Sequence, residues 1–227
     1  MEAPPKAIPT SYRARSYSVM LCCALYSGVL VTLMSGSASA YTVTLNPASP
    51  LTVYLQIGVG SFTANYINGG QPQNNATINT ESVAVASAVV GNGAAQAMTT
   101  DSTATASHHD GYTFCSVPGQ LYIGGFYRTT GATTAAAQVT ATVPASLMNA
   151  SGDTVSFAKI RWASSGNGDS GAEPFPAGTF VAGGVQNVGS MASNQWAESC
   201  WAFSYLNITV PPAGTYAGVV RYTLSAP

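Results

Sequence analysis

The chain has 227 residues, of which 46% are apolar, 10% aromatic and only 7% charged, and its formal net charge is −1. Seven Lys and Arg residues cannot build the basic stripe that neutralises phosphates, so this composition excludes nucleic-acid binding. Its apolar share also excludes ordinary intrinsic disorder. A chain rich in Thr, Val and turn residues but poor in charge favours β-strands.

The first forty residues have the pattern of a secretory signal peptide. Arg13 and Arg15 precede an apolar run over residues 19–34, and the small-residue sequence Ala38-Ser39-Ala40 follows. A membrane-spanning helix is the alternative, but the run is about 16 residues long and a bilayer needs roughly 20. We therefore expect cleavage after Ala40 and export of the chain.

Residues 41–59 alternate between apolar and polar side chains with a period of two. This alternation predicts an extended segment with one buried face. Pro47 and Pro50 cannot donate to a ladder, so the segment is either an edge strand or two strands with a bend. The apolar positions that we expect to share the buried face are Val43, Leu45, Leu51, Val53 and Leu55.

Further short strands are expected along the rest of the chain, separated by turn signals such as Pro118-Gly119 and Ser151-Gly152-Asp153. Many short strands at even spacing predict an all-β fold of the β-sandwich type. Residues 91–107 and 130–137 fit a loop, a strand or a short helix equally well. The expected strands cover residues 61–67, 82–90, 111–117, 120–127, 136–143, 154–162, 179–183, 201–210 and 215–225.

Cysteine usage also fits export. Cys22 and Cys23 leave with the signal peptide, so only Cys115 and Cys200 remain, and they have a single intramolecular pairing. Two buried free thiols are the alternative. Size predicts one domain after the signal peptide, with an extended arm over residues 41–60 and a sandwich over residues 61–227.

Catalysis has weak support in the sequence. His108-His109-Asp110 is the only cluster of metal-ligand types, and on a strand adjacent side chains point to opposite faces. Residues 166–171 resemble a serine-protease nucleophile loop slightly, but their Ser and Gly content equally suits a long turn. The few carboxylates are scattered over loops. We expect a protein that is not an enzyme and that uses no cofactor or metal.

Aromatic residues leave a sugar-binding site open as an interpretation. Trp162, Trp196 and Trp201 could stack on sugars, although such side chains more often fill a sandwich core. Three sequence triplets, beginning at Asn75, Asn149 and Asn207, match the N-glycosylation pattern, which matters only in a eukaryotic protein.

The C-terminal residues carry the most specific signal. Pro212, Ala213 and Gly214 form a turn signal, and an alternating strand follows them almost to the end of the chain. The alternating positions are Tyr216, Gly218, Val220, Tyr222 and Leu224. This ending resembles the last strand of bacterial chaperone–usher pilus subunits. Residues 42–44, Pro50 and residues 55–56 are similar to the N-terminal arm of the colonisation-factor branch, and spore-coat-U-like subunits share the ending.

The resemblance implies an Ig-like β-sandwich that lacks its final strand, completed by the N-terminal arm of a neighbouring subunit. It implies identical or related pilus subunits, a periplasmic chaperone and an outer-membrane usher as partners. It also implies passage through the periplasm to a cell-surface fimbria, for adhesion or biofilm formation. A carbohydrate-binding adhesin or minor tip subunit, with host or surface glycans as ligands, is the alternative.

Overall fold

The computed structural model describes residues 43–63, 71–73, 77–131, 135–166 and 172–227, all within one compact unit, Ser37–Pro227. The predicted signal peptide lies outside the described residues. The fold is all-β, as predicted, and the described residues contain one short 3-10 helix, η1 (Phe157–Lys159). The strands are β1 (Val43–Thr44), β2 (Thr52–Ile57), β3 (Phe62–Thr63), β4 (Gln71–Pro72), β5 (Glu81–Ser82), β6 (Gln96–Ala97), β7 (Thr99–Thr100), β8 (Leu121–Arg128), β9 (Ala137–Val143), β10 (Ser146–Met148), β11 (Thr154–Ser156), β12 (Ile160–Ser165), β13 (Gly178–Thr179), β14 (Gly184–Met191), β15 (Gln195–Tyr205) and β16 (Arg221–Ser225).

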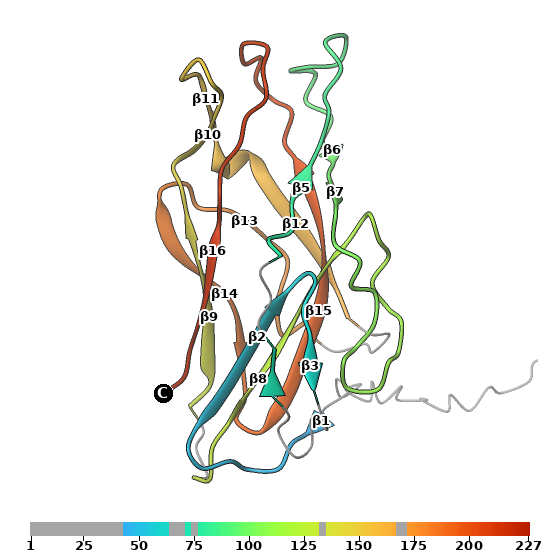
Figure 1. The fold of residues 1–227 in the computed structure, drawn as a ribbon. Helices are drawn as coiled ribbons and strands as arrows, with labels where there is room; N and C mark the ends of the chain where they lie inside the picture. Colours follow the sequence, from blue (N-terminus) through green and yellow to red (C-terminus); the bar gives the residue numbers. More distant parts are fainter. Residues whose placement is uncertain (1–42, 64–70, 74–76, 132–134, 167–171) are drawn as a thin grey trace, which may run out of the picture. The chain divides into compact units, whose positions relative to one another are not determined.

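Two antiparallel sheets form the sandwich (Figure 1). The larger has the order β13-β12-β15-β8-β2, with β1 and β6 also paired to β15, and the smaller has the order β14-β9-β16. A hydrophobic core lies between the two sheets, and alternate side chains of the strands in both sheets point into it. Its largest fully buried member is Trp201, which is 0% exposed.

The outer face of the larger sheet is also covered, so that all eight residues of β8 are buried. Val43 and Leu45 pack there against Tyr54, Phe126 and Trp196. Further along the sheet, a long loop covers Tyr122 and is tied to β15 by the disulfide Cys115–Cys200. The pairing predicted from the cysteine count is therefore confirmed.

Several predicted strands are present and several differ. Strands β8 and β9 agree with the predicted ranges 120–127 and 136–143 to within one residue. The predicted strand 154–162 is broken by η1, and in the predicted strand 111–117 only Thr113 forms a bridge. The predicted final strand begins at Arg221 rather than at residue 215. Its first alternating residues, Tyr216 and Gly218, lie before β16 on either side of Ala217, which forms an isolated antiparallel bridge with Met148.

The predicted single face of residues 41–59 is wrong. Val43 and Leu45 are buried on the outer face of the larger sheet, whereas Leu51 and Val53 are 44% and 39% exposed. Leu55 packs on the opposite side, against the core between the sheets. The two halves lie in different strands that pair with β15 and β8 of the same chain, so the bend over residues 46–51 reverses which positions face the outer cluster.

Candidate functional site: the open side of the sandwich

Strand β2 forms an edge of the larger sheet, because it pairs only with β8 in the described part of the chain. The Gly58 amide donates to the Tyr122 carbonyl oxygen at 2.7 Å, so Gly58 and Tyr122 form a hydrogen-bonded pair of this antiparallel ladder. In an antiparallel ladder such pairs alternate with non-hydrogen-bonded pairs, in which the N–H and C=O groups point away from the partner strand. The backbone N–H and C=O groups of Val53, Leu55 and Ile57 therefore point to the free edge.

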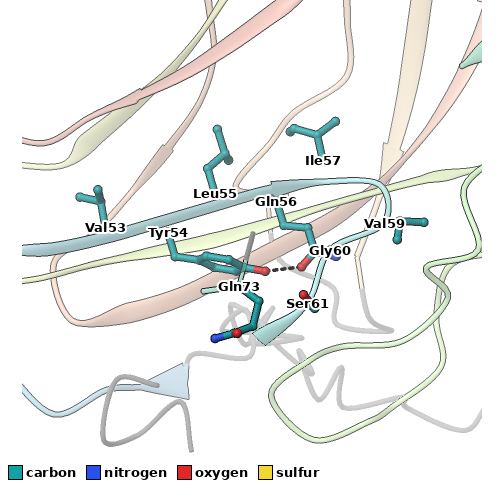
Figure 2. Close-up of a pocket in the computed structure, with 9 residues that line it drawn as sticks. All are labelled: Val53, Tyr54, Leu55, Gln56, Ile57, Val59, Gly60, Ser61 and Gln73. Carbon is teal, nitrogen blue, oxygen red and sulfur yellow. Dashed lines mark hydrogen bonds between the residues drawn. The ribbon is translucent and has the colours of Figure 1, made fainter. Parts of the chain in front are cut away.

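The side chains of β2 divide between its two faces (Figure 2). Val53, Leu55 and Ile57 project to one side of the strand, and Tyr54 and Gln56 project to the other. The Tyr54 hydroxyl donates to Gln56 Oε1, and Gln56 Nε2 donates to the Gly58 carbonyl oxygen at 2.8 Å. Burial raises the pKa of Tyr54 to about 12, so this hydroxyl stays a donor at neutral pH.

A pocket of about 390 Å³ lies along this edge strand. Residues of β2 line it, and the segment that follows β2 contributes the polar residues Ser61 and Gln73. The lining residues are Val53, Tyr54, Leu55, Gln56, Ile57, Val59, Gly60, Ser61 and Gln73.

The edge strand of the smaller sheet, β16, lies beside β2 across the sandwich. In the central strand β9 the inward side chains are 0–3% exposed, whereas Tyr222 and Leu224 of β16 are only half-buried. Leu55 and Ile57 of β2 are half-buried in the same way and pack against the same core. We call this surface, formed by β2 and β16 with Leu55, Ile57, Tyr222 and Leu224, the open side.

The opposite side of the sandwich is closed by the chain itself. Residues 180–183 cross from β13 in the larger sheet to β14 in the smaller one, and Phe180 on this crossing is buried. The side chain of Gln186 fastens the crossing, because it accepts from the Val181 amide and donates to the Thr179 carbonyl oxygen. The two sides therefore differ. One is closed by a covalent connection, whereas on the other the described residues pair no further strand with β2 or β16, and the core side chains of these two strands are only half-buried.

Two carboxylates near the open side have pKa shifts of opposite sign. Burial raises the pKa of Glu81 in β5, and the nearby Asp101 charge raises it further, although a hydrogen bond with Thr100 opposes this. Hydrogen bonds from the Asn79 side chain, 2.8 Å, and the Thr80 amide, 2.9 Å, lower the pKa of Asp101.

These shifts predict opposite effects of neutralising the two carboxylates. Because ionised Glu81 is disfavoured in the folded state, Glu81→Gln should raise the melting temperature at pH 7, and this advantage should vanish as the pH falls through the raised pKa. Because folding favours ionised Asp101, Asp101→Asn should lower the melting temperature at pH 7. This effect should begin to decline near pH 4 and vanish as the pH falls through the lowered folded-state pKa. Thermal unfolding of both variants between pH 3 and 8 tests this, and shifts of the same sign at pH 7 would contradict it.

The other predicted sites are not brought together. The described residues contain no group of three or more His, Cys, Asp and Glu side chains that could hold a metal ion. His108 packs edge-on against Tyr122, with ring centroids 6.0 Å apart, and burial lowers the pKa of His108. Asp110 accepts from the Tyr112 amide within its own loop, at 2.8 Å. Most of the protease-like loop, residues 167–171, lies outside the described residues.

The tryptophans have core positions. Trp162, Trp196 and Trp201 are 4%, 6% and 0% exposed, so none offers an open ring face for stacking on a sugar. The sugar-binding interpretation therefore loses its three tryptophans.

Two of the three glycosylation triplets have structural roles, and the third, at Asn75, lies outside the described residues. Asn207 is 0% exposed; its side chain accepts from the Gly91 amide and donates to the Val89 carbonyl oxygen, both at 2.7 Å. Asn149 is 8% exposed and accepts from the Ser151 and Asp153 amides. The side-chain amides of Asn149 and Asn207 therefore hold their neighbouring loops in place.

Comparison with known proteins gives no relative. No protein-family model, curated protein or solved structure matches this chain. Among the described residues, no helix is long and apolar enough to cross a membrane.

Proposed function

We propose that this chain is a structural subunit of a bacterial surface fibre, in which copies join by β-strand addition. The open side is the observation that carries this proposal, because it has free edges and half-buried apolar side chains where the other side of the sandwich is sealed. An added strand there would satisfy backbone groups of Val53, Leu55 and Ile57 and cover the core.

Docking of a strand would contribute a moderate free energy of burial for each side chain that it covers. Full burial of a large aliphatic or aromatic side chain is worth about 1.5–3 kcal/mol, so covering a half-buried one contributes roughly 1 kcal/mol. Four such residues on the open side, with additional ladder hydrogen bonds, have to outweigh the cost of ordering the incoming strand. An incoming strand with apolar side chains of its own contributes further free energy by burying them as well.

The strand that fits is the N-terminal arm of a second copy. Its apolar residues Val43, Leu45 and Leu51 precede the six-residue ladder that ties β2 to β8. Val53 and Leu55 belong to that ladder, so we limit the donated segment to residues 41–51. Its even positions Thr42, Thr44 and Asn46 are polar and suit the outer face of an added strand.

Export is part of the same proposal. The predicted signal peptide directs the chain to the periplasm, where a chaperone would cover the open side until an outer-membrane usher adds the subunit to a cell-surface fimbria. Related subunits would then be its neighbours. A surface poor in charge, with 7% charged residues, suits close packing of identical copies.

The test compares inward and outward positions on β16. In the secreted chain beginning at Tyr41, Leu224→Arg should abolish polymers, because the charge would face the docked strand. Thr223→Arg, on the exposed face, should assemble as the wild type does. Deletion of residues 41–51 should also abolish polymers.

Assembly is followed by size-exclusion chromatography with light scattering and by electron microscopy. Circular dichroism of each variant confirms that its fold is kept. A wild-type chain that stays monomeric at high concentration, or a Leu224→Arg variant that polymerises normally, would refute the fibre proposal.

A further inference from the structure

In the structure the N-terminal arm lies on its own sheet. Val43 and Thr44 of β1 pair with Trp196 and Gln195 of β15. The Leu45 amide then donates to the Asn194 carbonyl oxygen at 2.8 Å. Among the arm residues that the structure describes, from Val43 onward, this ladder covers three, so side-chain contacts have to supply much of what holds the arm.

Two apolar side chains anchor the arm in an aromatic cluster. Val43 and Leu45, which are 7% and 1% exposed, pack against Tyr54, Phe126 and Trp196. Tyr54 stacks on Trp196 with ring centroids 6.0 Å apart, and Phe126 is tilted against both rings at 5.6 and 5.8 Å. Burial of these two side chains therefore stabilises the docked position of the arm.

Arg128, at the end of β8, holds the arm beyond these anchors. Its side chain is 5% exposed, and its Nε donates to the Asn46 carbonyl oxygen at 2.6 Å, while Nη2 donates to that of Pro47 at 3.3 Å. No other hydrogen bond and no ion pair of this guanidinium occurs among the described residues. A buried guanidinium without partners is costly, so arm and arginine stabilise each other.

The link between the docked arm and β2 is exposed. Of the residues 46–51, only Ala48 is partly buried. We call the surface formed by Tyr54, Phe126, Trp196 and Arg128 the dock. Because the link is exposed, movement of the arm would break few contacts other than those with the dock and the ladder with β15.

We infer that this dock stores the arm on its own subunit and that Arg128 is the latch that limits its release to a second copy. The inference rests on the proposed function, in which the same arm is donated. Self-docking then competes with transfer to the open side of a neighbour. An isolated subunit keeps Val43 and Leu45 covered until a neighbour offers a longer ladder.

The test removes the latch and measures the arm directly. In the purified monomer of Arg128→Gln, hydrogen exchange of the Leu45 amide should be roughly tenfold faster than in the wild type, while the β9 amides stay protected. Assembly of that monomer should accelerate by a similar factor. Arg161→Gln is the matched control, because Arg161 is exposed and its Nε donates to the Ser204 hydroxyl at 3.2 Å, far from the arm residues.

A second variant locks the arm in its docked position, and its result does not depend on whether Arg128→Gln folds normally. Thr44 and Gln195 are directly opposite in the ladder, so Thr44→Cys with Gln195→Cys should form a disulfide that locks the arm. The oxidised double variant should not assemble, whereas Thr44→Cys alone should.

Unchanged exchange of Leu45 in Arg128→Gln, or assembly by the locked variant, would overturn the latch. If the wild-type chain itself never assembles, the proposed function fails. The exchange measurement still shows whether Arg128 holds the arm.

Discussion

Replacing Cys115 with Ser is expected to lower the free energy of unfolding by about 2–4 kcal/mol. The bridge joins residues 85 positions apart, and in the chain-entropy picture a loop of that length is worth roughly 4 kcal/mol. Both cysteines are buried, at 3% and 0% exposed, and they pack with Tyr122, so loss of the bridge also loosens the loop over the outer face. For a domain of this size the melting temperature should fall by roughly 5–15 °C.

Thermal unfolding with and without reductant measures this effect. The wild type in reductant should melt near the temperature at which the Cys115→Ser variant melts without reductant. Thr113→Ser, a change at an exposed residue of the same loop, should melt within about 2 °C of the wild type. Two alkylatable thiols in the folded, oxidised wild type, or equal melting temperatures for variant and wild type, would contradict the prediction.

The sequence allowed the fold class and the disulfide to be predicted for simple physical reasons. The two cysteines outside the predicted signal peptide have one possible pairing, and regular alternation in residues 136–143 marks a strand whose alternate side chains face the core. Strand β14 was missed because Gly184, Asn187 and Gly189 interrupt its pattern and a register shift lies between Asn187 and Gly189. At Gly189 the backbone passes so close to Phe175 that a Cβ atom would lie 2.4 Å from its ring.

The candidate site was only partly accessible from sequence. Alternation identified the apolar residues of the arm, but it could not show that the bend over residues 46–51 sends Val43 and Leu55 to opposite faces of the sheet. Arg128 was not predicted as a functional residue, because its role depends on carbonyl groups more than 80 positions away in the sequence. A lone arginine at the end of an apolar strand was the one available signal.

Trp201→Ala is expected to have the largest effect on stability of any single aromatic substitution in the core. Trp201 is fully buried, its Nε1 donates to the Phe175 carbonyl oxygen at 3.0 Å, and its ring lies 5.2 Å from that of Trp162 and 5.9 Å from that of Tyr222. It therefore links the larger sheet to β16, the strand that borders the open side.

Truncation of a buried tryptophan costs about 3–5 kcal/mol, a large part of a total stability of about 5–15 kcal/mol. Denaturant unfolding followed by circular dichroism measures the loss, with Trp201→Phe as a milder variant that should lie between wild type and Trp201→Ala. Tyr112→Ala is the control, because that ring is 54% exposed and its loss should cost less than about 0.5 kcal/mol.

Because Trp201 supports β16 from inside, Trp201→Phe should also weaken the polymers of the proposed fibre more than its loss of stability alone explains. Polymers of Trp201→Phe as stable as those of wild type, despite a lower unfolding free energy, would separate the core from the open side and contradict this coupling.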